Sequence, residues 1–166
     1  KIYWRLPWFL KGIIEVTHNK YRERKFNKIK VRSNGMLSPK VYKRIFEYAY
    51  QNASSNIIEI GAAHGSATAC LGLGIKKSGF DSKVFSFEKG EGGSRSSYGE
   101  KKENLTILKN NLDYFQVQDY VEIIPDFITE KYELPQEIKE NAPYSLILID
   151  ADGEIPRDLK KFYELL

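Results

Sequence analysis

Short apolar runs alternate with longer amphipathic stretches along most of this chain, and the alternation predicts its secondary structure. A helix is expected from Ser38, a capping residue that is followed by Pro39 at the first helical position. Its expected apolar stripe comprises Val41, Ile45, Phe46 and Ala49. Farther along, we expect strands over Asn56–Ile60, Lys83–Glu88, Tyr120–Ile124 and Tyr144–Asp150, and helices over Ser66–Lys77, over Glu100–Gln116, within Thr129–Asn141 and from Pro156.

Strands that alternate with helices of this length are typical of βαβ units with right-handed crossovers. The predicted fold class is therefore α/β, a Rossmann-like doubly wound and mainly parallel sheet. The pattern stops after the fourth strand and its helix, so we expect a truncated sheet in a fragment whose C-terminal part is missing. The expected organisation is a helical, basic and aromatic extension over residues 1–36 and one ligand-binding domain over residues 37–166.

Basic residues are concentrated at the start of the chain. Residues 1–35 carry ten Lys or Arg and two Asp or Glu, a net charge of +8, whereas the remaining residues carry 16 against 20. Together with Trp4, Trp8, Phe9 and Tyr21, this charge suits contact with an anionic surface such as a membrane, a glycan or a nucleic acid. The alternative is a solvated helix face on a docking arm, and no clear nucleic-acid motif is present.

The single cysteine, Cys70, excludes an internal disulfide, and its apolar setting predicts a buried thiol in a reducing compartment. The longest apolar run near the start, LPWFL, is far too short to span a membrane, and no cleavable signal pattern follows it. We therefore expect a soluble, cytoplasmic protein.

The stretch IIEIGAAHGSATA, residues 57–69, is the first candidate site. Ligands of doubly wound sheets bind beyond the carboxyl ends of the strands, and a glycine-rich turn there lets a ligand approach backbone amides. The predicted contacts are Gly61, Ala62, Ala63, Gly65 and Ser66, with a tight turn that binds nothing as the alternative. His64 in the same turn is expected to be a surface histidine.

Two acids at strand ends indicate which ligand would bind. Glu59 lies inside an apolar strand, where a carboxylate needs a polar partner, and Glu88 ends the next strand, where it is suited to accept two ribose hydroxyls. An ordinary strand-end acid is the alternative for Glu88. Backbone donors and two acids suit S-adenosylmethionine, which has an amino acid end, a ribose and a cationic sulfonium.

The motifs NIIEIGAAHGSATA, VFSFEKGEGG, ENLTILKNNL and YSLILIDADG together resemble those of class I S-adenosylmethionine-dependent methyltransferases. Within that superfamily they are similar to the small-molecule O-methyltransferases of the catechol and caffeoyl-CoA type. The resemblance covers about residues 37–166. It implies that the turn with Glu59 holds the methionine part, that Glu88 binds the ribose, and that Asp126 and Phe127 border the adenine. Core packing is the alternative for Phe127.

The resemblance also implies a role for Asp150 as a catalytic residue and ligand of a divalent cation such as Mg²⁺, with Asp152 as a second ligand. The chain departs from the family pattern at Gly153, where members often have lysine. Helix capping is the alternative for both acids.

The predicted function is methyl transfer from S-adenosylmethionine to an oxygen of a small molecule, a sugar or a secondary metabolite. A Rossmann-type NAD-dependent oxidoreductase is the first alternative, although the glycine spacing is GxxxG and not GxGxxG. The second is a non-catalytic, methyltransferase-like binding module. Because the fourth strand is expected to lie at an open edge, we expect a homo-oligomer if the chain ends at Leu166, as the alternative to a fragment.

Overall fold

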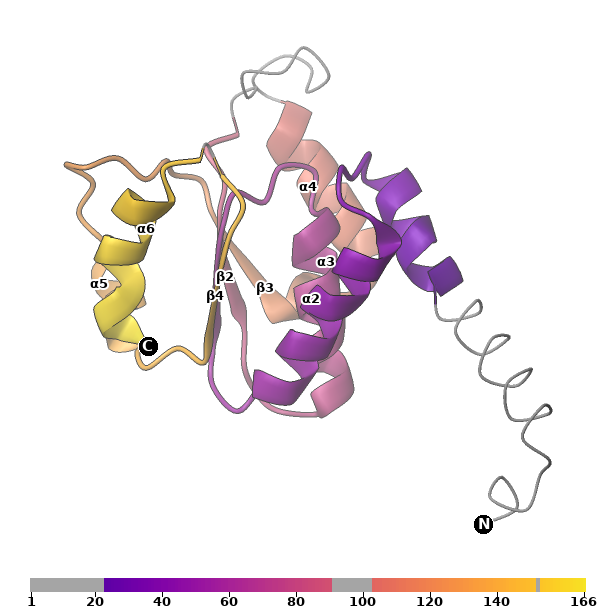
Figure 1. The fold of residues 1–166 in the computed structure, drawn as a ribbon, viewed down its shortest axis with the longest axis horizontal. Helices are drawn as coiled ribbons and strands as arrows, with labels where there is room; N and C mark the ends of the chain where they lie inside the picture. Colours follow the sequence, from indigo (N-terminus) through magenta and orange to yellow (C-terminus); the bar gives the residue numbers. More distant parts are fainter. Residues whose placement is uncertain (1–22, 91–102, 152) are drawn as a thin grey trace.

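The computed structural model describes residues 23–90, 103–151 and 153–166 (Figure 1). Four parallel strands form one sheet in the order β3-β2-β1-β4, with β1 at Ile57–Ile60, β2 at Val84–Phe87, β3 at Val121–Ile124 and β4 at Leu146–Ile149. The register pairs Glu59 of β1 with Ser86 of β2 and with Leu148 of β4. Each predicted strand is confirmed, and each is shorter than predicted by one to three residues.

The helices follow the predicted alternation. They are α2 (Pro39–Asn52), α3 (Ser66–Ser78), α4 (Glu103–Tyr114), α5 (Gln136–Glu140) and α6 (Ile155–Phe162), with the 3₁₀ turns η2 (Gln118–Tyr120) and η3 (Tyr163–Leu165). Residues 23–32 are also helical. The rest of the predicted N-terminal extension, and residues 91–102, lie outside the described residues.

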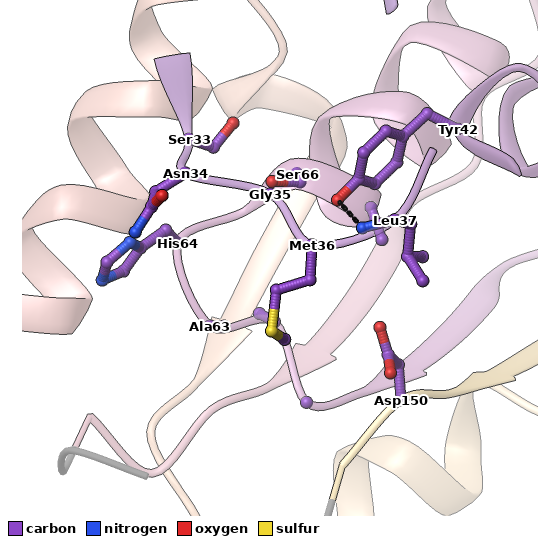
Figure 2. Close-up of a pocket in the computed structure, with 13 residues that line it drawn as sticks. Ser33, Asn34, Gly35, Met36, Leu37, Tyr42, Ala63, His64, Ser66 and Asp150 are labelled. Carbon is purple, nitrogen blue, oxygen red and sulfur yellow. Dashed lines mark hydrogen bonds between the residues drawn. The ribbon is translucent and has the colours of Figure 1, made fainter. Parts of the chain in front are cut away.

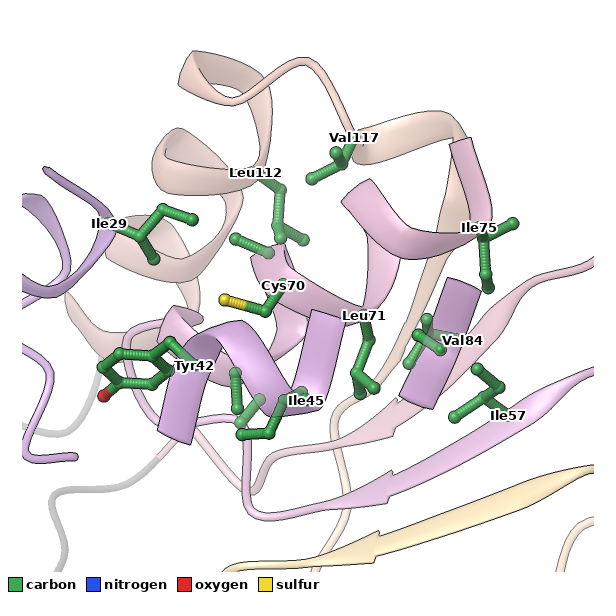
Figure 3. Packing of buried hydrophobic residues seen from close by; sticks show 14 of the residues in the cluster. Ile29, Tyr42, Ile45, Ile57, Cys70, Leu71, Ile75, Val84, Leu112 and Val117 are labelled. Carbon is green, nitrogen blue, oxygen red and sulfur yellow. The ribbon is translucent and has the colours of Figure 1, made fainter. Parts of the chain in front are cut away.

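Both faces of the sheet are covered, as a doubly wound fold requires (Figure 1). On one face, α2, α3 and α4 pack around Ile57 and Val84 in a continuous apolar cluster, part of which Figure 3 shows. On the other face, Ile138 of α5 and Phe162 of α6 pack against Ile58, Ile60 and Phe87. The predicted Rossmann-like, doubly wound sheet is therefore confirmed, and all of its described strands are parallel.

The buried stripe of α2 differs from the predicted one. Val41 is 42% exposed, whereas Tyr42 is 2% exposed and packs into the core with Ile45 and Ala49. Burial of the Tyr42 ring is possible because its hydroxyl accepts a hydrogen bond from the backbone N–H of Leu37 at 3.2 Å. Burial of Tyr42 in place of Val41 brings this hydroxyl to the pocket at the carboxyl ends of the strands.

Close packing joins α2 to α3. A Cβ at Gly74 would lie 2.6 Å from the Cβ of Ala49, so only glycine allows the two helix backbones this approach. Cys70 is fully buried in the same layer, as predicted, and burial raises the pKa of its thiol. Phe26 and Ile29 belong to the same buried cluster, and they attach the helical residues 23–32 to the outside of this layer.

The edge strand β4 is less buried than the central strands. All residues of β1 and β2 are buried, whereas those of β4 are partly exposed. Among the described strands, β4 pairs only with β1. None of the described helices is both long and apolar enough to cross a membrane.

Candidate functional site

The turn after β1 has a backbone that only small residues allow. Gly61 has φ of 93°, and a Cβ there would overlap the carbonyl oxygen of Asp150 at the end of β4. Ala63 has φ of 48°, and Gly65, the N-cap of α3, has φ of 85°. A Cβ at Gly65 would lie 2.6 Å from Cδ1 of Leu108. Because these glycines lack a Cβ, the turn can lie close to the end of β4 at Gly61 and close to α4 at Gly65.

The carboxylate of Glu88 binds this turn. Its Oε2 accepts a hydrogen bond from the backbone N–H of Ala63 at 2.6 Å, and its Oε1 accepts one from the N–H of Gly90 at 3.2 Å. The short distance to Ala63 is typical of a charge-assisted bond. Two predicted site residues from different strand ends are thus in direct contact.

Glu59 is fully buried behind the turn. Its Oε2 accepts a hydrogen bond from Ser86 Oγ at 2.6 Å. Its Oε1 and the nearby Thr68 Oγ1 have no hydrogen bond of good geometry among the described residues. Burial raises the pKa of Glu59 to about 7, the hydroxyls of Ser86 and Thr68 oppose this shift, and the carboxylates of Asp150 and Glu88 add to it. The Glu59 carboxyl group is therefore enclosed behind the pocket and does not line it.

A pocket opens at the carboxyl ends of β1 and β4 (Figure 2). Five of the predicted site residues line it, namely Gly61, Ala62, Ala63, Ser66 and Asp150. The Asp150 backbone is anchored by a hydrogen bond from its N–H to the carbonyl of Ile60 at 2.9 Å. The structure thus brings the glycine turn and the acid of β4 into one wall.

The opposite wall consists of residues that the sequence did not indicate as a site. Residues 33–37, which connect the helical residues 23–32 to α2, line the pocket together with Tyr42. A Cβ at Gly35 would overlap the Tyr42 hydroxyl and lie 2.5 Å from Ser66 Oγ, so this segment lies directly on the start of α3. Burial raises the pKa of the Tyr42 phenol, and a hydrogen bond with Ser66 opposes the shift. The available signal was the turn sequence SNGML, in which Asn34 has φ of 50°.

His64 is buried, so the expectation of a surface histidine is wrong. Its Nε2 lies 3.1 Å from Asn104 Oδ1, and its carbonyl accepts a hydrogen bond from Asn111 Nδ2 at 2.8 Å. Both asparagines come from α4 and are themselves buried. The histidine lines the pocket and at the same time fixes the turn to α4.

The loop after β3, which contains Asp126 and Phe127, contacts Lys89, the residue that follows Glu88. Phe127 is partly exposed, which excludes core packing, and Lys89 Nζ lies 4.9 Å from its ring centroid. The Phe127 N–H donates to Asp126 Oδ1 at 2.9 Å. Neither residue lines the pocket beside Asp150, so their predicted contact with adenine requires a ligand that extends past Glu88.

The described residues do not make up a cation site. They include no group of three or more His, Cys, Asp or Glu side chains that could hold a metal ion. Asp150 lies at the pocket wall, and Asp152 lies outside the described residues.

No family model matches the chain, and no curated protein matches it. Solved structures with a similar fold include an O-methyltransferase from Bacillus cereus in complex with SAH, with a TM-score of 0.59 and 18% identity over 87% of this chain and 61% of that chain. SAH-bound PaMTH1, a methyltransferase from Podospora anserina, has a TM-score of 0.62 and 15% identity over 96% and 66%. A putative caffeoyl-CoA O-methyltransferase from Staphylococcus aureus has a TM-score of 0.59 and 17% identity over 94% and 67%.

The chain thus has the fold of the S-adenosylmethionine-dependent O-methyltransferases, the class that its four motifs resemble. It spans about three fifths of the length of the first of these structures, because it covers 61% of the Bacillus cereus protein.

Proposed function

We propose that this chain binds S-adenosylmethionine and belongs to an enzyme that transfers its methyl group to an oxygen of a small molecule, a sugar or a secondary metabolite. One observation carries the proposal: the Glu88 carboxylate at the end of β2 lies against the glycine turn at the end of β1, 2.6 Å from Ala63 N. An acid and a glycine turn at adjacent strand ends match a ligand that has hydroxyls and a charged amino acid end.

Different residues would bind different parts of the cofactor. Gly61, Ala63 and the start of α3 at Ser66 would hold the methionine part, with the carboxyl group of Glu59 buried behind them. Glu88 would exchange its backbone partners for the ribose hydroxyls, and Asp126 and Phe127 would border the adenine. The known structures bound to SAH have this fold, which supports the proposal.

The bound cofactor supplies a methyl group on a sulfonium, and transfer breaks the carbon–sulfur bond and forms a carbon–oxygen bond. What the chain supplies is alignment, which is worth much of the rate in such displacements. Asp150 would accept a hydrogen bond from the acceptor hydroxyl at the pocket wall, and the hydroxyl proton would pass to this carboxylate as the carbon–oxygen bond forms. Tyr42 and residues 33–37 would exclude water from the opposite side.

Assistance by Mg²⁺ is a separate proposal. Asp150 and Asp152 are acids of the right kind, but the described residues hold no group of three ligands. Further ligands would have to come from outside them, and no step of the transfer is derived through the cation. Asp150→Asn should spare cofactor affinity; in a protein with a complete site it should also remove any response of turnover to Mg²⁺.

Calorimetric titration of the chain with S-adenosylhomocysteine and with NAD tests the cofactor. We expect binding of the first and none of the second. Binding of NAD alone would overturn the proposal in favour of an oxidoreductase. Binding of S-adenosylhomocysteine without methyl transfer by the full-length protein to any of a panel of hydroxylated acceptors would instead favour a non-catalytic binding module.

The organisation and location of the chain are proposals of the same kind. We keep the division into an extension over 1–36 and a cofactor domain over 37–166, which limited proteolysis would test. A homo-oligomer is supported by the edge position of β4. A cytoplasmic location is supported by the buried, unpaired Cys70, and fractionation of cells would test it.

A further inference from the structure

Five cationic side chains lie together on the outer side of the helical layer, away from the sheet. Lys25, Lys28 and Arg32 project from the helical residues 23–32, which lie outside α2 and α3 (Figure 1), and Lys76 and Lys77 from the last turn of α3. We call these five residues the basic face. It is separate from the pocket, none of whose lining residues belongs to it.

Aromatic rings connect the two parts of the basic face. Lys25 Nζ and Lys77 Nζ lie 5.1 Å and 5.6 Å from the ring centroid of Phe46, and Lys77 Nζ also lies 5.4 Å from that of Tyr50. The two rings stack with an interplanar angle of 6°. The ammonium groups of Lys25 and Lys77 are thus gathered around one aromatic pair.

A second ring extends the basic face toward the end of α4. Lys28 Nζ and Arg32 Cζ lie 5.0 Å and 4.8 Å from the ring centroid of Tyr114. Lys76 Nζ donates to the carbonyl of Gln116 at 2.8 Å. Each of the five cations thus contacts an aromatic ring or a backbone carbonyl. These partners carry no negative charge, so they do not neutralise the positive charge of the basic face.

No carboxylate among the described residues forms an ion pair with these side chains. The ion pairs there join other side chains, such as Lys43 to Glu47, and none includes a member of the basic face. Burial lowers the pKa of Lys25, and the neighbouring charges of Lys77 and Lys76 lower it further. Cations that repel each other without a counter-ion favour an anionic partner at this face.

We infer that the basic face docks on an anionic lipid bilayer. Cation-covered rings are poor platforms for stacking bases, which argues against single-stranded nucleic acid. Val31, 72% exposed on the same helix, adds an apolar contact that suits a lipid interface. The preceding sequence also supplies Trp4, Trp8 and Phe9, residue types that prefer such interfaces.

Co-sedimentation of the full chain with vesicles tests this inference. Vesicles of phosphatidylcholine with about a third phosphatidylserine should bind the chain, vesicles of phosphatidylcholine alone should bind it far less, and added salt should weaken binding. The variant Lys28→Gln/Lys77→Gln should bind about 25-fold more weakly, because each lysine near an anionic bilayer contributes about fivefold.

A matched control is Lys139→Gln/Lys160→Gln, which removes the same charge from exposed lysines of α5 and α6 on the other side of the sheet. It should bind within about threefold of the unchanged chain. Equal losses in the two variants, or equal binding to neutral vesicles, would overturn the inference. So would a folded chain that ignores the vesicles but binds a fluorescent oligonucleotide through Lys28 and Lys77.

Discussion

Two acids one strand apart have different surroundings, Glu59 within the sheet layer and Glu88 at its edge. Glu59 is fully buried between the sheet and α3, and burial raises its pKa more than the hydroxyls of Ser86 and Thr68 lower it. Glu88 lies where β2 ends and accepts hydrogen bonds from two backbone N–H groups. The same residue type is thus a candidate for proton uptake in one place and for hydroxyl binding in the other.

The raised pKa of Glu59 predicts that the stability of the ligand-free chain depends on pH. The folded pKa is about 7 and the ordinary value is 4.5, so the folded state holds an extra proton between them. The free energy of unfolding should therefore fall as pH rises through this window, by about 3 kcal/mol, and level off above it. Glu59→Gln cannot ionise and should remove this part of the pH dependence.

Urea unfolding at a series of pH values measures the effect. Glu59→Gln should be more stable than the unchanged chain near pH 8, by about 3 kcal/mol, and about equal to it near pH 4.5. Glu133→Gln, a change at an exposed acid, should keep the original dependence. Parallel curves for Glu59→Gln and the unchanged chain would show that the pKa of Glu59 is the same in the folded and unfolded states.

The contacts of Glu88 make glutamine the sharper substitution there. Glu88→Ala would remove both the proposed ribose acceptor and the acceptor that holds Ala63, so it should weaken ligand binding and also lower the stability of the ligand-free turn. Glu88→Gln keeps one acceptor oxygen and loses the charge. We expect its affinity for S-adenosylhomocysteine to fall about ten- to a hundredfold, as for a lost charged hydrogen bond of about 1.5 to 3 kcal/mol.

Calorimetric titration of Glu88→Gln, with Glu133→Gln as the control, provides the measurement. The thermal midpoint of the ligand-free variant should change by only a few degrees, because the bond to Ala63 can still form. Unchanged affinity would mean that the ligand lies elsewhere, even if the fold is correct.

At the scale of elements, the turn between β1 and α3 is fixed by contact with β4. Gly61 and Gly153 have nearly the same φ, 93° and 95°, but a Cβ at Gly61 would overlap the backbone of Asp150, whereas one at Gly153 meets nothing within 4 Å. Gly153→Ala should therefore lower the free energy of unfolding by about 1 to 3 kcal/mol through backbone strain alone. Gly61→Ala should lower it by at least about 2 kcal/mol more, since two strand ends must separate.

Urea unfolding of the two variants isolates this contact, because backbone strain is common to both. Equal losses of stability would mean that the end of β4 moves away from a Cβ at residue 61 at little cost in free energy, and that the pocket wall at Asp150 is not rigid. The expected difference would instead identify Gly61 as the residue that keeps the turn and Asp150 together.

The elements themselves were predictable because apolar runs of strand length and amphipathic helices leave different periods in the sequence. Gly61, Ala63 and Glu88 were predictable as neighbours since carboxyl ends of parallel strands share one edge. The contribution of Tyr42 and residues 33–37 to the pocket could not be predicted in this way. It depends on burial of Tyr42 in place of Val41, and the sequence does not show whether a tyrosine hydroxyl will find a buried partner.

At the scale of the whole molecule, α6 and the edge strand β4 leave apolar surface uncovered. Ile155, Leu159, Tyr163 and Leu166 are exposed along α6 and the residues after it, while Phe162 is buried beneath them. Because β4 also lacks a second partner among the described strands, we expect copies of this chain to associate through this side. Light scattering after size-exclusion chromatography should give a mass above 19.2 kDa that rises with concentration.

A charge on α6 should oppose this association. Leu159→Glu should raise the dissociation constant at least about tenfold, because a leucine loses about 1.5 to 3 kcal/mol of apolar burial. Phe80→Glu is the matched control: Phe80 is 53% exposed, Leu159 is 44% exposed, and Phe80 follows α3 and not α6. A chain that stays monomeric at every concentration would contradict the prediction, and equal effects of the two substitutions would move the contact away from α6. A selective effect of Leu159→Glu would mean that the association depends on the α6 side of the molecule, next to the edge of the sheet.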